Sequence, residues 1–375
     1  MRITFVLPSY PKKPTGGFRV VYEYANHLVE RGHRVNIVHP RKVKNIPPPP
    51  NLYRKLRREI AYFLHKILLN PKPKWQFIDD RVNMLYVPEP TLQYIPDADI
   101  IFATFWSLAE YVYEYSENKG EKCYLFQHYE TWGGPKEKVD ATWKAPFHKV
   151  VISKWLYNIG QSLGAKDMVY IPNGINHNHF KILNPIEERK PCVSMMYSEI
   201  PWKGAEDGLE ALTLTKKRFP NLQTILFGAE KRTRNIPNWI EYRQGPSQES
   251  LVKDIYNQSS IYLCPSHAEG FALPPAEAMA CGCAVVSTDC GGIRDFAKDG
   301  TTALLSSPQN AEILARNLIR LLENDELRIK IAKAGHEQIQ QFSWEHSANL
   351  FEQFMNVCVN NRKKHSNDKS FNNNS

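Results

Sequence analysis

Two apolar patterns alternate along most of this 375-residue chain. Short apolar runs are typical of buried strands, and longer stretches with an apolar residue every three or four positions are typical of amphipathic helices. In the first half, strands are expected over residues 2–7, 34–38, 99–104, 122–128, 150–153 and 168–172, and helices over 18–31, 105–118 and 154–163. In the second half, strands are expected over 193–197, 223–227, 261–264 and 284–286, and helices over 205–218, 247–258, 309–323, 325–341 and 344–357.

Strands that alternate with helices in this way predict an α/β fold with parallel sheets. The polar stretch 176–190 interrupts the alternation and predicts a linker. We therefore expect two Rossmann-like domains, 1–178 and 179–342, facing across a cleft. A helix over 343–358 follows, and the remainder, 359–375, is rich in Asn, Ser and Lys and predicts a disordered polar tail.

Composition narrows the class of protein. A hydrophobic content of 42% and a charged content of 23% are those of an ordinary globular protein, and no apolar run reaches the length of a membrane span. Seven scattered cysteines favour a reduced compartment over a disulfide framework, and the first residues meet Pro8 too soon for a signal-peptide core, so we expect a cytoplasmic protein. The net charge of +9 favours anionic partners, but aromatic residues do not cluster with the basic ones as in nucleic-acid binders.

A basic amphipathic segment breaks the alternation over residues 51–69. Its apolar positions recur at helical spacing, and arginines and lysines lie between them. Such a helix can lie on an anionic membrane surface, which would place the protein at the inner face of a membrane. It can equally pack its apolar stripe against its own domain and leave the basic face in water. Co-sedimentation with vesicles, with and without this segment, separates the two.

The stretch from Ser266 to Thr288 holds the densest group of candidate binding residues. It runs from a strand through a glycine-containing loop into a short helix that opens on two prolines, which the first turn of a helix accepts. Glu269 falls in the loop, and Glu277 follows about two helical turns later. Ligands of open α/β sheets bind at the carboxyl ends of the strands, so both carboxylates are expected at a binding edge.

Other strand ends carry further candidates. They are Gly16 and Gly17 before the first helix, His128 after a strand, Lys203 at a helix start, and Gly291 and Gly292 at a second strand-to-helix junction. Glycines and a lysine at helix N-termini suit phosphate groups, and a histidine near a cleft suits a sugar or a phosphate. Each also has a common structural explanation, as a flexible turn, a solvated surface lysine or a histidine that anchors a loop.

The chain resembles the family 4 retaining glycosyltransferases, the "glycosyl transferases group 1", over residues 1–358. The similarity is carried by Glu269-Gly270-Phe271-Ala272-Leu273-Pro274, by the E-x7-E spacing from Glu269 to Glu277, by Ile171-Pro172-Asn173-Gly174-Ile175, by Gly291-Gly292-Ile293 and by Lys203-Gly204. The resemblance implies the GT-B fold, with a C-terminal helix that crosses back to the N-terminal domain. It also implies an acceptor-side N-terminal domain, a C-terminal domain for the nucleotide-sugar, and no divalent metal or other cofactor.

The resemblance also implies roles for single residues. Glu277 would accept hydrogen bonds from the ribose, Glu269 would contact the donor sugar, and Lys203 would neutralise the leaving diphosphate. His128 occupies the place of the family's active-site histidine, so the implied catalytic residues are His128, Glu269 and Lys203. The implied donor-binding residues are Gly16, Gly17, Lys203, Glu269, Gly270, Phe271, Ala272, Leu273, Glu277, Gly291 and Gly292.

The chain departs from the family pattern at two places. Ser198 stands where the family usually carries an arginine, so one diphosphate contact is missing or comes from Arg19 or Arg232. Glu130 lies two residues from His128, and either residue is a candidate for the role of the histidine.

The function expected from these features is transfer of a sugar, with retention, from a nucleotide-sugar to a hydroxyl group of a glycan, a lipid-linked or another acceptor. The leaving phosphate would take the acceptor's proton while Lys203 and fixed dipoles stabilise the diphosphate. A sugar-nucleotide epimerase or a non-catalytic sugar-nucleotide-binding protein of the same fold is the alternative, because fold alone does not separate these activities.

Overall fold

The computed structural model describes residues 1–45, 60 and 72–372, with side chains as far as Arg362. The chain forms two compact units. Unit 1 consists of Met1–Pro172 and Trp344–Ser375, and unit 2 of Asn173–Ser343. The N–H of Ile175 donates to the carbonyl of Phe342 at 2.9 Å, which connects the residues after Pro172 to the end of unit 2. The basic segment over 51–69 lies outside the described residues, apart from Ile60.

The described part of unit 1 contains a seven-stranded parallel sheet in the order β3-β2-β1-β4-β5-β6-β7. Its strands are β1 (Arg2–Val6), β2 (Arg34–Pro40), β3 (Asn83–Val87), β4 (Ile100–Ala103), β5 (Glu121–Phe126), β6 (His148–Val151) and β7 (Met168–Tyr170). Its helices are α1 (Gly16–Glu30), α3 (Trp106–Glu114), α4 (Lys136–Lys144), α5 (Lys154–Ser162) and α11 (Trp344–Asn372), with short turns η1 (Leu92–Tyr94) and η2 (Glu117–Lys119). The central strand β4 is buried along its whole length, as expected for a parallel sheet covered on both faces.

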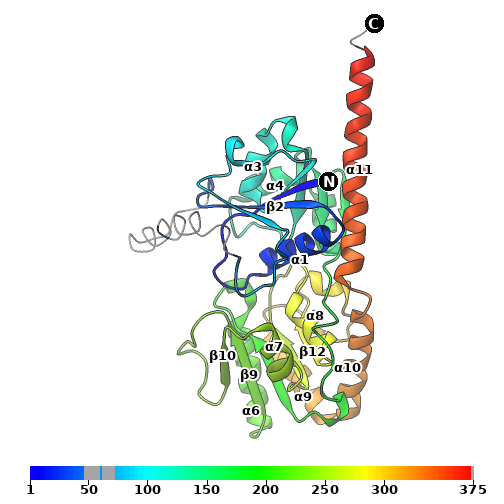
Figure 1. Ribbon diagram of the computed structural model, residues 1–375. Helices are drawn as coiled ribbons and strands as arrows, with labels where there is room; N and C mark the ends of the chain where they lie inside the picture. The colour runs from blue at the N-terminus through cyan, green and yellow to red at the C-terminus, as the bar shows by residue number, and fades with distance from the viewer. Residues whose placement is uncertain (46–59, 61–71, 373–375) are drawn as a thin grey trace. The chain divides into compact units, whose positions relative to one another are not determined.

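The C-terminal helix α11, drawn in red in Figure 1, packs against α1 and β5. The Phe351 ring stacks on Tyr24 and Phe102 at centroid distances of 4.3 and 4.9 Å, and Glu352 accepts hydrogen bonds from Arg31 and His33 at 3.1 and 2.8 Å. The predicted return of this helix to the N-terminal domain is therefore confirmed.

The helix α11 also extends past residue 358, where the sequence predicts a disordered tail, and ends at Asn372. Arg362 donates to the carbonyl of Glu117 at 2.6 Å and lies 3.4 Å from a Glu121 carboxylate oxygen. Because adding a residue to an existing helix costs far less than starting one, a polar sequence can continue a helix whose earlier turns are held by packing.

Unit 2, which is described throughout, contains a six-stranded parallel sheet in the order β10-β9-β8-β11-β12-β13. Its strands are β8 (Cys192–Met196), β9 (Gln223–Gly228), β10 (Glu241–Gln244), β11 (Ile261–Cys264), β12 (Ala284–Thr288) and β13 (Leu304–Ser306). Its helices are α6 (Ala205–Arg218), α7 (Gln248–Ser250), α8 (Leu273–Ala280), α9 (Ala311–Glu323) and α10 (Asp325–Ile339), with turns η3 (Ile186–Glu188), η4 (Pro201–Lys203), η6 (Gly292–Asp295) and the π-helical η5 (Leu251–Tyr256).

Both sheets are doubly wound, and each has one point where the strand order reverses. In unit 1 this point lies between β1 and β4, and in unit 2 between β8 and β11. Connections on the two sides of such a point run to opposite faces and leave a crevice at the carboxyl ends of the strands. Among the described residues, no helix is both long enough and apolar enough to cross a membrane.

Candidate functional site

The turn that carries Lys203 connects β8 to α6 at the switch point of unit 2. Gly204 joins η4 to α6 with a φ of +63°, and a Cβ at this position would lie 2.0 Å from the carbonyl oxygen of Pro265. The left-handed conformation and the close approach both require glycine. The N–H of His267 donates to the carbonyl of Trp202 at 2.7 Å, so the loop after β11 holds this turn in place.

Lys203 and Glu269, which come from the two strands that flank the switch point, form an ion pair. The Lys203 ammonium lies 2.7 and 2.9 Å from the two carboxylate oxygens of Glu269, and the Ser266 hydroxyl donates to the first of these oxygens at 2.8 Å. Burial lowers the pKa of Lys203, but the charge and hydrogen bonds of Glu269 outweigh this effect and raise the pKa above its ordinary value. Lys203 is therefore a fixed cation at neutral pH.

The loop that carries Glu269 is bonded to the loop after β12. The Glu269 N–H donates to the carbonyl of Cys290 at 2.7 Å, and the Gly292 N–H donates to the carbonyl of Glu269 at 3.1 Å. A Cβ at Gly292 would lie 2.2 Å from the carbonyl oxygen of Gly270. The predicted glycine pair therefore lets two backbones meet and positions Glu269. Gly291, with a φ of +89°, makes the turn into this contact.

Glu277 lies on α8, which begins directly after the Glu269 loop. Its side chain is buried, and the Tyr256 hydroxyl donates to it at 3.1 Å. Burial and the nearby Glu277 charge raise the pKa of Tyr256 well above its ordinary value, so the phenol stays a donor. Ala272 caps α8 in the left-handed region with a φ of +69°, a conformation that non-glycine residues adopt mainly where the surroundings impose it.

Unit 2 therefore combines three kinds of group at the carboxyl edge of its sheet. Lys203 is a cation, the N-terminus of α8 favours negative charge, and the carboxylates of Glu269 and Glu277 accept hydrogen bonds. A ligand with an anionic part and several hydroxyl groups suits this set.

In unit 1, the glycine pair lies at the start of α1, after β1. The Gln127 side chain donates to the carbonyl of Gly17 at 3.0 Å, and a Cβ at Gly17 would lie 3.5 Å from that amide. Gly16 and Gly17 are thus connected to the residue that precedes His128. The glycine pair and His128 therefore lie at the same edge of the sheet, and the Gln127 side chain connects them. Gln127 was not among the residues predicted from the sequence.

His128 is half-buried beside aromatic rings. Its Nδ1 lies 3.0 Å from the carbonyl of Tyr129 and 3.3 Å from the indole nitrogen of Trp132, and its ring lies 5.8 Å from Trp155 in an edge-to-face contact. Nδ1 donates to Tyr129 in one tautomer and accepts from Trp132 in the other. The loop thus holds the imidazole in one orientation.

Glu130, the alternative to His128, is buried and bonded inside unit 1. It accepts hydrogen bonds from the N–H of Trp106 at 2.7 Å and from the hydroxyl of Tyr124 at 3.0 Å. Burial raises its pKa to about 8, although both hydrogen bonds oppose the shift. Glu130 holds the first turn of α3, so the half-buried His128 is the better placed of the two to meet a ligand.

The two arginines suggested as substitutes for an arginine at position 198, Arg19 and Arg232, both have partners within the chain. The Arg232 guanidinium donates to the carbonyls of Ile236, Pro237 and Ile240 at 2.6–3.1 Å and closes its own loop. Arg19 lies 4.0 Å from the Glu23 carboxylate, one helical turn away. Ser198 accepts a hydrogen bond from the N–H of Ile200 at 3.4 Å.

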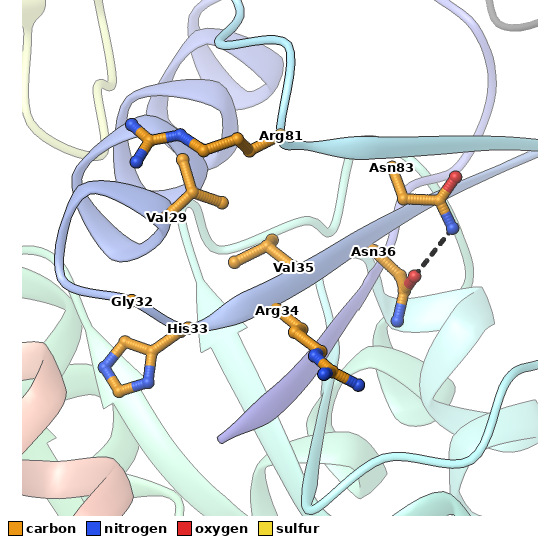
Figure 2. A pocket seen from close by; sticks show the side chains of 8 residues that line it. All are labelled: Val29, Gly32, His33, Arg34, Val35, Asn36, Arg81 and Asn83. Atoms are coloured by element: carbon orange, nitrogen blue, oxygen red, sulfur yellow. Dashed lines mark hydrogen bonds between the residues drawn. The ribbon is translucent and has the colours of Figure 1, made fainter.

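A cavity of about 490 Å³ in unit 1 lies away from the predicted residues (Figure 2). It opens at the amino ends of β2 and β3, where Asn83 donates to Asn36 at 2.8 Å. Its lining is Val29, Gly32, His33, Arg34, Val35, Asn36, Arg81 and Asn83. Because ligands of such sheets bind at the opposite, carboxyl edge, this cavity is not our candidate site.

Comparison with known proteins identifies the second unit. Residues 177–338, almost all of unit 2, match the family described as Glycosyl transferases group 1. The second unit of this chain is therefore similar to that family over 162 residues. The group 1 unit contains Lys203, Glu269 and Glu277, so the predicted E-x7-E and Lys-Gly elements lie inside the matched range.

Curated relatives match part of the chain. A phosphatidyl-myo-inositol mannosyltransferase of Mycobacterium tuberculosis is 28% identical over 198 residues, which cover 49% of this chain and 52% of the relative. An N,N'-diacetylbacillosaminyl-diphospho-undecaprenol alpha-1,3-N-acetylgalactosaminyltransferase of Campylobacter jejuni is 25% identical over 189 residues, 49% of each protein. The chain thus spans about half the length of these relatives.

Solved structures match nearly the whole chain. Sucrose-phosphate synthase of Thermosynechococcus elongatus has a TM-score of 0.70 at 17% identity, over 95% of this chain and 98% of that one. HepE of Anabaena, solved with UDP-glucose, has a TM-score of 0.70 at 14% identity, over 95% and 100%. TarM of S. aureus, solved with UDP among other ligands, has a TM-score of 0.72 at 11% identity, over 95% and 99%. The predicted GT-B fold, with two Rossmann-like domains, is confirmed.

Several residues that shape the site were missed by the sequence analysis. Ser266 and Tyr256 orient the two glutamates, and Asp207 lies 2.6 Å from the imidazole of His267 at the start of α6. Ser266 lies three residues before Glu269 and could have been proposed from that spacing. Tyr256 lies in a different element from Glu277, and no local pattern links them.

Proposed function

We propose that this protein is a retaining glycosyltransferase that moves a sugar from a nucleotide-sugar to a hydroxyl group of a glycan or a lipid-linked acceptor. The observation that carries the proposal is the Lys203–Glu269 pair at the switch point of the group 1 unit, beside the N-terminus of α8. The names of two relatives, which transfer sugars to lipid compounds, support the lipid-linked acceptor.

The chemistry follows from the groups in place. The Lys203 ammonium has three N–H donors, of which two point to Glu269, and we assign it to the diphosphate whose charge grows as the glycosidic bond breaks. Glu269 is assigned to the donor sugar and Glu277 to the ribose. Because both carboxylate oxygens of Glu269 accept hydrogen bonds from Lys203, we assign Glu269 the role of a hydrogen-bond acceptor and no role as an acid.

Retention is proposed through transfer on one face of the sugar. The leaving phosphate oxygen takes the proton of the acceptor hydroxyl as that hydroxyl attacks the anomeric carbon. We assign the Gly16–Gly17 turn and His128 as the groups through which unit 1 takes part. Fixed donors and charges lower the barrier because they need no reorganisation during the reaction.

A panel of UDP-, GDP-, ADP- and dTDP-sugars tests the proposal in two stages. A donor that binds the folded protein raises the melting temperature, and the stabilising donor is then incubated with candidate acceptors. Release of the nucleoside diphosphate that depends on acceptor supports transfer, and NMR of the product gives the anomeric configuration. Interconversion of the nucleotide-sugar without an acceptor would favour an epimerase instead.

Variants of Lys203 and Glu277 connect the activity to this site. Lys203→Met and Glu277→Gln should both lower acceptor-dependent turnover strongly, whereas Lys253→Met should not. Lys253 is a suitable control because it also forms an ion pair at 2.7 Å, with Glu249, on the exposed surface of the same unit. Normal turnover in either site variant would contradict the roles assigned here.

A further inference from the structure

A cluster of thiols, an imidazole and carboxylates lies in unit 1, at the amino end of the sheet. Cys123 on β5 pairs in register with His148 on the neighbouring strand β6. The helix α11 packs over β5, and its buried Cys358 lies where both Cys123 and His148 influence its thiol. Two cysteines that are 235 positions apart in sequence therefore meet beside one imidazole.

Charged groups surround His148 from each neighbouring element. Asp167, just before β7, hydrogen-bonds its Nδ1, and the Glu121 carboxylate on β5 lies 3.5 Å from its Nε2. Arg362 on α11 lies 3.4 Å from Glu121 and donates to the carbonyl of Glu117, which fixes the helix one turn after Cys358. The imidazole is thus held between two carboxylates and a thiol.

This arrangement favours a thiolate–imidazolium pair. Interactions of the imidazolium with Cys358 and with the accepting carboxylate of Glu121 raise the pKa of His148 to about 10, and burial opposes this shift. Cys123 and His148 both lower the pKa of the Cys358 thiol, Cys123 more strongly. Burial raises this pKa, but the two neighbours outweigh it, so the pKa of Cys358 lies below its ordinary value. A thiolate is the reactive form of cysteine, and a neighbouring imidazolium is a common way to stabilise it.

We propose that Cys358 and Cys123 are a peroxide-sensitive thiol pair, in which Cys358 reacts first and Cys123 closes a disulfide that joins α11 to β5. The thiols are buried, but the His148 side chain is 27% exposed and connects the cluster to solvent. This site is separate from the one assigned to the nucleotide-sugar, and the proposal does not depend on the proposed function.

The reaction has two steps. The Cys358 thiolate attacks one oxygen of hydrogen peroxide, the O–O bond breaks, and a sulfenic acid and hydroxide form; the His148 imidazolium can protonate that hydroxide to water. The Cys123 sulfur then attacks the Cys358 sulfur, the S–O bond breaks, and the thiol proton leaves with the hydroxyl group as a second water. Two electrons pass from the thiols to the peroxide.

The test uses the reduced full-length protein. It is treated with hydrogen peroxide at pH 7, the remaining thiols are alkylated after denaturation, and the peptides are mapped by mass spectrometry. We expect a Cys123–Cys358 cross-linked peptide that dithiothreitol releases. C358S should abolish it, C123S should leave a sulfenic acid at Cys358 that dimedone traps, and C192S should leave the cross-link unchanged. Oxidation of Cys358 no faster than that of Cys192 would overturn the proposal.

Cys192 is a matched control because it is a buried thiol whose burial raises its pKa to about 11, and its hydroxyl neighbour Ser259 carries no charge. H148Q should slow the oxidation of Cys358 at pH 7 by about tenfold, because an ordinary thiol is only a few per cent ionised there. If H148Q does not fold, a measurement on the wild-type protein provides the test. The rate at which iodoacetamide alkylates each cysteine is measured as a function of pH. The rate for Cys358 should level off at a lower pH than the rate for Cys192, and coinciding pH–rate profiles would refute the proposal.

Discussion

Replacing Lys203 by methionine keeps most of the side chain's length but removes the ammonium group that holds Glu269. In the wild-type structure this ammonium lies 2.7 and 2.9 Å from the two oxygens of a carboxylate whose residue is 8% exposed. The variant leaves this carboxylate inside the site without its cation. We therefore expect Lys203→Met to lower the free energy of unfolding.

The magnitude follows from what remains around Glu269. Removing one partner of a buried ion pair typically costs about 3–5 kcal/mol, because the other charge is left uncompensated. The Ser266 hydroxyl still donates to Glu269 at 2.8 Å, and a hydrogen bond to a charged group contributes about 1.5 kcal/mol. We expect a loss of about 2–4 kcal/mol in the free energy of unfolding at pH 7.

The pH dependence of the unfolding free energy gives a second, independent test of the ion pair. Because the pKa of Lys203 is raised on folding, its contribution is complete at neutral pH and is lost only as the pH rises through the folded value. The difference in unfolding free energy between wild type and variant should therefore be present at neutral pH and should shrink only at strongly alkaline pH.

Urea unfolding followed by circular dichroism measures these free energies, and a double-mutant cycle with Glu269→Gln isolates the coupling between the two side chains. Lys253→Met, which breaks an exposed ion pair in the same unit, should change the stability little. A Lys203→Met variant as stable as wild type, or additive effects in the cycle, would refute the energetic account of the pair.

Three further results are expected. Gly204→Ala should destabilise the protein by about 2–4 kcal/mol, because the new Cβ meets a backbone oxygen at a position with a φ of +63°. The control Gly164→Ala, at a position with a φ of +76° but open space around it, should cost about 1 kcal/mol in the same urea titration. Glu130→Gln should remove a fall in stability between about pH 5 and pH 8, because the wild-type carboxyl has its pKa raised to about 8 and must lose its proton inside the fold as the pH rises; parallel stability–pH curves would count against this. Tyr256→Phe should weaken binding of the stabilising nucleotide by about fivefold, because Glu277 loses a hydrogen bond that contributes about 1 kcal/mol. Calorimetry measures this affinity, and an unchanged affinity would contradict the assignment of Glu277 to the ribose.

Much of the fold follows from local patterns. Helix α6 spans the predicted residues 205–218, and strands such as β11 match because a short apolar run between polar turns has few other stable conformations. The short strand β10 was not predicted, since its residues Glu241–Gln244 are mostly polar. It forms because β9 offers free hydrogen-bonding groups at the edge of the sheet, which no local pattern shows.

For the candidate site, the residue types and their places after strand ends can be read from the sequence alone, since motifs such as Lys203-Gly204 and Glu269 to Glu277 are contiguous in the chain. The contacts of these residues depend on the folded units: Lys203 binds Glu269, Tyr256 orients Glu277, and Cys358 lies close to Cys123 and His148. These contacts join segments 21–235 residues apart, and their distances depend on strand order and helix packing. A pattern along one segment carries information about the face that segment buries, whereas the partner across that face is chosen by the fold of the whole unit.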